Sequence, residues 1–181
     1  MKKLMIIVAA VALAGAAQAA TMSWSVLNMQ AQGVEAGWLV ALYDASTTFE
    51  YAKAKDGTLA PLYTGAAFST GTQIRAGSSG NTKPGSTDQF SAGDSISAYA
   101  VIFNAATIAD ATQVMISEVR SATVGSAGGN ISLAFGNMMA TNSSNSFNGA
   151  SFVPTSGIPE PTSGLLMLVG LGALALRRRK A

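Results

Sequence analysis

The sequence contains neither cysteine nor histidine, and each absence excludes a kind of chemistry. Without cysteine there is no disulfide, no thiolate zinc site and no thiol nucleophile, so burial must hold the fold together. Without histidine the chain lacks the usual general base at neutral pH and the commonest metal ligand. We therefore expect no enzymatic activity, no metal site and no cofactor.

Charged residues are also scarce, at 11% of the sequence, and they are unevenly placed. Between the two ends of the chain, five cations stand against eight carboxylates, a net charge of −3. A nucleic-acid partner needs a cationic patch that displaces counterions from phosphates, so we exclude that class of partner. The other six cations lie at the ends: Lys2, Lys3, Arg177, Arg178, Arg179 and Lys180.

The carboxylates and lysines of the central region form no catalytic pattern. No two carboxylates make a close sequence pair of the kind that hints at a glycosidase. Asp88, Asp94 and Asp110 are too dispersed to form one calcium-binding loop, and the few lysines give no specific pairing with a serine. Carboxylates brought together only by folding stay open at this point, so a small secreted hydrolase remains an alternative.

The first residues have the pattern of a secretory signal peptide. Two lysines and the apolar run 4–15 precede Ala17-Gln18-Ala19, the small-x-small pattern that signal peptidase cleaves. The alternative is an uncleaved anchor, but the run is shorter than the ~20 residues that a spanning helix needs. We expect a signal peptide over residues 1–19, with cleavage after Ala19 and, as second choice, after Ala20.

Three features follow one another in the C-terminal region. Pro159, Glu160 and Pro161 form a stiff, extended handle, because each proline fixes its own φ and biases the preceding residue away from helix. The stretch 165–176 would form a helix that is apolar on every face, with leucines at Leu165, Leu166, Leu168, Leu171, Leu174 and Leu176. A basic cluster follows: Arg177, Arg178, Arg179 and Lys180.

The apolar stretch predicts a marginal transmembrane helix. Over residues 162–176 it would extend about 22 Å at ~1.5 Å per residue, less than the ~30 Å hydrocarbon layer. It can span only if the bilayer thins and the arginines snorkel, which suits temporary retention in the inner membrane. The basic cluster would stay cytoplasmic by the positive-inside rule, which places the rest of the chain across the membrane.

The order of handle, apolar helix and basic cluster resembles the PEP-CTERM sorting signal, and the run PEPTSGLL at 159–166 is a close match. The resemblance is confined to residues 158–181. It implies recognition by an exosortase, a membrane-embedded cysteine transpeptidase, with release of the tail and transfer of the body to the outer cell surface or extracellular matrix. Family members are often found alongside exopolysaccharide and biofilm genes. The alternative is a plain tail anchor with a chance tripeptide.

The body, residues 20–157, has short apolar runs separated by turn formers, a texture typical of an all-β domain. Residues 23–26 alternate between polar and apolar, and 37–44 are apolar on both faces, as in a central strand. Residues 95–104 predict the best core strand, with Ile96, Ala98, Ala100 and Ile102 on one face and Tyr99, Val101 and Phe103 on the other. With further strands over 112–119 and 130–135, separated by a turn at Gly125, Gly128 and Gly129, we expect a single β-sandwich, jelly-roll-like.

Three other segments of the body predict a helix, a loop and an edge strand. Residues 46–55 predict a short helix, with Thr47 and Glu50 as a capping box and an end at Asp56-Gly57. Residues 77–91 predict a long exposed loop. After residue 137 we expect an edge strand through 147–153 and then a stalk.

Aromatic residues are the candidates for stacking on sugar rings, and we expect roughly four of six to be core, with Tyr51 and Tyr63 at the surface. The six are Trp24, Trp38, Tyr43, Tyr51, Tyr63 and Tyr99. Taken together, the sequence favours an exported structural protein of the cell surface or matrix, associated with exopolysaccharide or biofilm. The alternatives are a carbohydrate-binding module and the small hydrolase. The expected partners are exosortase, signal peptidase, the inner membrane transiently, and exopolysaccharide.

Overall fold

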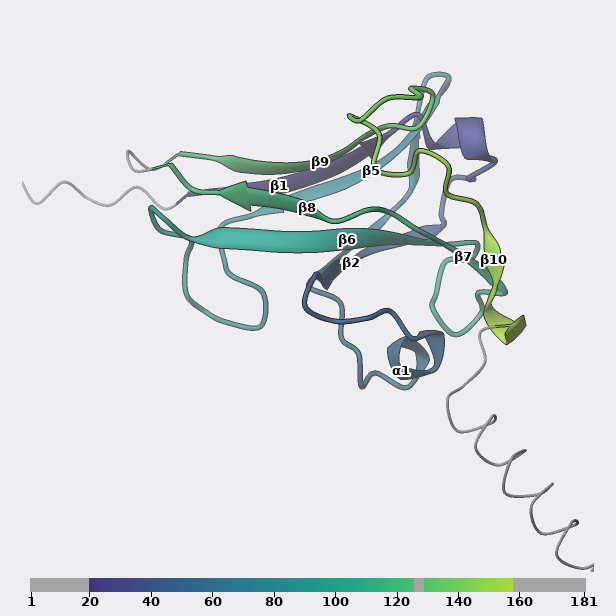
Figure 1. Cartoon of the computed structure of the whole chain (residues 1–181), viewed down its shortest axis with the longest axis horizontal. Helices are drawn as coiled ribbons and strands as arrows, with labels where there is room; N and C mark the ends of the chain where they lie inside the picture. The colour runs from purple at the N-terminus through teal and green to yellow at the C-terminus, as the bar shows by residue number, and fades with distance from the viewer. Residues whose placement is uncertain (1–19, 126–128, 158–181) are drawn as a thin grey trace, which may run out of the picture.

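The computed structural model describes residues 20–125 and 129–157, and this part of the chain is mostly β-structure in two sheets (Figure 1). The four-stranded sheet has the order β4 (Phe68–Thr70), β5 (Gln73–Gly80), β1 (Met22–Leu27) and β9 (Ile131–Asn137). The six-stranded sheet has the order β10 (Val153–Pro154), β7 (Gln113–Ile116), β6 (Ser95–Phe103), β2 (Leu39–Asp44) and β3 (Tyr63–Ala66), with β8 (Arg120–Thr123) also paired to β6.

Helical structure is limited in the described residues to α1 (Tyr51–Lys55) and two 3-10 turns, η1 (Met29–Gln32) and η2 (Thr155–Gly157). The expectation of a mostly β body with one short helix is therefore confirmed. Across residues 20–125 and 129–157, none of the helices has the length and apolar character needed to cross a membrane. The predicted signal peptide and the predicted apolar helix lie outside the described residues.

β6 organises the body because both of its faces are buried. Ile96, Ala98, Ala100 and Ile102 pack into the larger core cluster, which also takes side chains from β1, β5 and β9 of the other sheet. Tyr99, Val101 and Phe103 belong to a second cluster on the opposite face, which α1 helps to cover through Ala54 and Tyr51 (Figure 1). The two faces predicted for this strand are confirmed.

β1 and β2 also follow the predicted patterns. In β1 the apolar residues Met22, Trp24 and Val26 are buried and the residues between them are half-buried. β2 has four consecutive buried residues and lies between β3 and β6, as expected for a central strand. β1 is likewise central, since it pairs antiparallel with β5 and parallel with β9.

The loop predicted over 77–91 is wrong in its first part, because β5 continues to Gly80 and pairs with β1. The reason is the close approach of Trp24. A Cβ atom at Gly77 would lie 2.6 Å from the backbone oxygen of Trp24, and one at Gly65 of the other sheet would lie 3.1 Å from the indole ring. Gly77, one of the small residues that suggested a loop, is therefore required by the close approach of β1 at Trp24.

The helix is shorter than predicted and begins at Tyr51, so the predicted capping box does not form. Instead the Thr47 hydroxyl donates to the backbone oxygen of Asp44 at 2.7 Å, which places a turn where the helix was expected to start. Glu50 is the N-cap residue, with extended backbone and no side-chain capping bond. The predicted end at Asp56-Gly57 is confirmed, with φ at +83° for the glycine.

The strand predicted over 112–119 is interrupted. β7 ends at Ile116, and β8, which the sequence analysis missed, continues along β6 from Arg120. Between them the Ser117 N–H donates to the Ala100 oxygen at 2.9 Å, and its hydroxyl accepts the Ala100 N–H at 2.8 Å. The serine side chain thus replaces a main-chain partner, and the strand passes Ala100 with a bulge.

Residues 138–150, which we call the plug, fold against the sheets and do not form the predicted edge strand. The Ser146 N–H donates to the Phe135 oxygen of β9 at 3.0 Å, and its oxygen accepts the Glu118 N–H at 2.8 Å. The plug therefore joins β9 to the bulge between β7 and β8. Phe147 is 1% exposed and belongs to the core, so the predicted edge strand shrinks to β10.

Asparagine side chains shape the plug and its junction with β9. Asn137, Asn142 and Asn145 each accept, through the side-chain oxygen, the backbone N–H two residues further on, at 2.9, 3.0 and 3.0 Å. Such turns satisfy backbone groups without a neighbouring strand. Asn145 is buried, and its amide nitrogen donates to the Ala140 oxygen at 2.8 Å. Gly136 has φ at +87°, and a Cβ atom there would lie 2.0 Å from the Ser144 oxygen.

Candidate functional site

Nearly all residues predicted to direct export lie outside the described part of the chain. This holds for Ala17 and Ala19, for Pro159, Glu160 and Pro161, and for the apolar stretch and basic cluster that follow. Ala20 is described. It is 1% exposed, and its N–H donates to the Phe90 oxygen at 3.2 Å. Core packing thus already includes the residue that cleavage after Ala19 would make the N-terminus.

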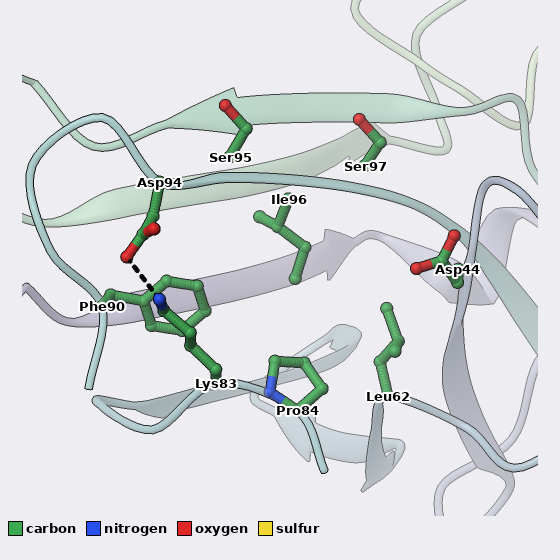
Figure 2. Close-up of a pocket in the computed structure, with 9 residues that line it drawn as sticks. All are labelled: Asp44, Leu62, Lys83, Pro84, Phe90, Asp94, Ser95, Ile96 and Ser97. Atoms are coloured by element: carbon green, nitrogen blue, oxygen red, sulfur yellow. Dashed lines mark ion pairs between the residues drawn. The ribbon is translucent and has the colours of Figure 1, made fainter. Parts of the chain in front are cut away.

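A cavity of about 350 Å³ opens where β2 ends and β6 begins (Figure 2). Such a volume falls at the lower end of the range for small-molecule sites. Its walls include apolar side chains from separate segments, and its charged groups are two carboxylates and a lysine (Figure 2). The lining consists of Asp44, Leu62, Lys83, Pro84, Phe90, Asp94, Ser95, Ile96 and Ser97.

The charged groups of this cavity are already engaged. Lys83 Nζ lies 2.9 Å from Asp94 Oδ2, and the same oxygen accepts the Ser91 N–H at 2.6 Å. These two bonds, that of Ser91 first, lower the pKa of the Asp94 carboxyl. Hydrogen bonds from Ser46 lower the pKa of the Asp44 carboxyl. Both groups are therefore ionised at neutral pH, whereas a general acid needs a raised pKa.

The serines of the cavity are paired with hydroxyls of β8. Ser95 Oγ lies 3.0 Å from Thr123 Oγ1, and Ser97 Oγ lies 2.7 Å from Ser121 Oγ. Both serine hydroxyls that line the cavity are therefore engaged in hydrogen bonds with β8. Within residues 20–125 and 129–157, no three acidic side chains gather in a way that could hold a metal ion.

A second hollow, a groove of about 740 Å³, lies beside the last described residues. One wall comes from α1 and its C-cap, and the other from residues 109–112. The Tyr51 hydroxyl lies 2.7 Å from the Ile108 oxygen and 2.8 Å from the Ala111 oxygen, so it holds the two walls together. The lining consists of Tyr51, Ala52, Lys55, Asp56, Ala109, Asp110, Ala111, Thr112, Thr155 and Ser156.

The six aromatic candidates do not form an exposed platform. Trp24, Tyr43 and Tyr99 are buried, and Trp38 is half-buried in edge-to-face contact with Phe152. Tyr51 and Tyr63, the expected surface pair, are half-buried as well. The Tyr63 hydroxyl donates to the Thr82 oxygen at 3.0 Å. Among the described aromatic residues, the exposed one is Phe68 of β4, at 47%.

Comparison with curated proteins found no match to this chain, and comparison with solved structures found none either. Comparison with protein families found one match, to the PEP-CTERM protein-sorting motif, over residues 157–180. These residues contain the predicted handle, apolar stretch and basic cluster. The chain therefore carries a PEP-CTERM sorting motif, which implies that an exosortase sorts it and that it is exported across the inner membrane to the cell surface or beyond.

Proposed function

We propose that the body is a structural protein of the outer cell surface or extracellular matrix and that it associates with exopolysaccharide or biofilm. The match of residues 157–180 to the sorting motif carries this proposal, because that motif addresses a protein to the outside of the cell. The body fits the role as a small domain with a buried apolar core.

The two sheets share the larger core cluster, and on that basis we propose that they form a β-sandwich. The parallel pairing of β1 with β9 departs from the antiparallel strands of a jelly roll, so the jelly-roll variant has less support.

The ionisation of the cavity carboxylates and the pairing of its serine hydroxyls support a non-enzymatic role. The two carboxylates of the Figure 2 cavity have lowered pKa values, and a glycosidase of the usual kind needs one carboxyl to stay protonated. The hydroxyls at its edge bond to one another. We therefore rank the small hydrolase last.

A carbohydrate-binding role is the second candidate, and one observation favours it. Asp44 is an exposed carboxylate beside the apolar wall of a cavity large enough for one small ligand, an arrangement that suits a hydroxyl-rich ring. The half-buried positions of Tyr51 and Tyr63 count against stacking on a flat glycan.

The decisive experiment compares the host with its exosortase gene intact and deleted. With exosortase, we expect the mature protein outside the inner membrane, with its N-terminus at Ala20 and without its tail, as measured by intact mass. Without exosortase, the tail should remain and the protein should stay in the inner membrane. Equal mass and location in the two strains would contradict the proposal.

Variants of the handle separate a sorting motif from a plain anchor. Alanine at Pro159, Glu160 and Pro161 leaves the apolar stretch and the basic cluster intact, so insertion should be unchanged while tail removal stops. Alanine at the four basic residues should instead weaken retention and orientation before processing. If the handle variant is trimmed and exported like the parent, the tripeptide has no role in sorting.

A further inference from the structure

Hydrogen bonds hold the C-terminal segment of the body against the rest of the body as far as Thr155. The Thr155 N–H donates to the Thr112 oxygen at 2.8 Å, and its hydroxyl donates to the Ala111 oxygen at 3.2 Å. Just before it, β10 pairs with β7. The handle begins at Pro159, only four residues later.

This short connection limits how far the handle can move from the body. A fully extended chain spans at most ~3.6 Å per residue, so Pro159 lies within about 14 Å of Thr155 in any conformation. An enzyme that grips the handle must therefore come within about that distance of the same end of the body. The groove is part of the surface at this end, since Thr155 and Ser156 line it.

The groove has the properties of a surface that recognises protein. Its walls are fixed to each other by the Tyr51 hydroxyl, so the shape is preorganised. Ala52 and Ala109 leave room between the walls, and Lys55, Asp56 and Asp110 place both signs of charge at the edge. A lipid surface attracts basic and apolar side chains, so the two carboxylates favour a protein partner.

We propose that this groove docks on the exosortase while the enzyme holds the handle. The proposal rests on exosortase sorting of this chain and adds a second contact to it, made by the folded body. Because the short connection holds the groove close to the handle, even a weak contact between groove and enzyme raises the fraction of enzyme that has the handle bound. Tail removal then depends on the surface of the body as well as on the handle.

The test blocks the groove without touching the handle. Ala52→Arg places a long side chain between the walls, and Ala109→Arg does so from the opposite wall; both positions are exposed. Ala92→Arg, on the exposed turn before Asp94, is the matched control. Pulse-chase labelling in the native host follows loss of the tail by intact mass. We expect each groove variant to slow it by about tenfold and the control to leave it unchanged.

A longer connection separates docking from a general defect. With twelve Gly and Ser residues inserted between Ser156 and Gly157, the groove variants should process at the same rate as the parent carrying the same insertion. Equal slowing with and without the insertion, or no slowing at all, overturns the proposal. Processing of the alanine handle variant at the parent's rate would instead overturn exosortase sorting itself.

Charge changes in the groove distinguish contact with a lipid surface from docking on the enzyme. Lys55→Glu should slow processing if the groove faces anionic headgroups, while Ala52→Arg, which adds a positive charge, should then speed it. That pair of results would overturn docking on the exosortase. Slowing by Ala52→Arg supports it.

Discussion

β5 and the plug are both rich in small polar residues, yet they are held in place in different ways. β5 takes its form from its partner: it pairs with β1 over five residues and passes so close to Trp24 that only glycine fits at position 77. The plug is shaped by three asparagines, Asn137 at the end of β9 and Asn142 and Asn145 within the plug, each of which accepts the backbone N–H two residues further on. Small residues therefore mark close approach in one segment and self-contained turns in the other, and variants can separate the two.

The largest effect is expected where the plug meets β9. Gly136→Ala would place a Cβ atom 2.0 Å from the Ser144 oxygen in backbone that already has φ at +87°. Overpacking and the left-handed conformation together should lower the free energy of unfolding by about 3–5 kcal/mol. Gly149→Ala has a similar φ of +78° but open space around it, so it should cost only about 1–2 kcal/mol. Urea unfolding of both variants measures the difference, and equal losses would show that steric contact plays no part.

The next effect isolates packing in β5. Gly77→Ala brings a Cβ atom to 2.6 Å from the Trp24 backbone oxygen, so β5 must move away from β1 at a cost of about 1–3 kcal/mol. Gly80→Ala, in the same strand, meets nothing within 4 Å and should change the free energy of unfolding by less than about 0.5 kcal/mol. Thermal unfolding followed by circular dichroism ranks the two. A neutral Gly77→Ala would mean that β5 tolerates a side chain there and is not shaped by Trp24.

A smaller effect tests the asparagine turns of the plug. Asn145→Ala removes the side-chain partner of the buried Phe147 N–H and of the half-buried Ala140 oxygen, which should cost about 2 kcal/mol. Asn142→Ala removes a turn of the same kind at an exposed position, where water replaces the lost bond, and should cost less than about 0.5 kcal/mol. Amide exchange at Phe147 reports the loss locally. Matching losses in the two variants would show that burial adds nothing to the turn.

The smallest effect concerns the loop that follows β5, which is held by charge. Because Ser91 and Lys83 lower the pKa of Asp94, its contribution to stability is present above the ordinary carboxyl pKa and is lost as the pH falls through the lowered value. Asp94→Asn should therefore lower the melting temperature slightly at pH 7, and the difference from the parent should shrink as the pH falls below the ordinary carboxyl pKa. Asp88→Asn, exposed on the same loop, is the control. A difference between parent and Asp94→Asn that stays constant on acidification would contradict the charge-based role.

The sequence predicted the elements whose pattern is local and strong. β1, β2, β6 and β9 have alternating or continuous apolar residues, and the faces of β6 followed from periodicity alone. The sorting motif was likewise predictable because its three parts are adjacent in the chain. β3, β4, β5 and β8 were missed because small and polar residues there depend on a distant partner for their form.

The candidate sites were harder to predict than the strands. The Figure 2 cavity draws Asp44, Lys83 and Asp94 from separate segments, so spacing in the sequence gave no sign that they meet. The groove likewise combines α1, residues 109–112 and the end of the body. The asparagines at 137, 142 and 145 are a signal for consecutive turns in place of a strand, because an asparagine side chain readily accepts the backbone N–H two residues further on.

The central position of β1 sets an order of events in time. Its two neighbours are β5, about fifty residues later, and β9, whose Ile131 is the partner of Met22. A chain that crosses a membrane from its N-terminal end delivers β1 first and β9 nearly last, so the four-stranded sheet cannot close until almost the whole body has emerged. Contacts that distant in sequence form slowly, and the edge of β1 stays open to other chains meanwhile.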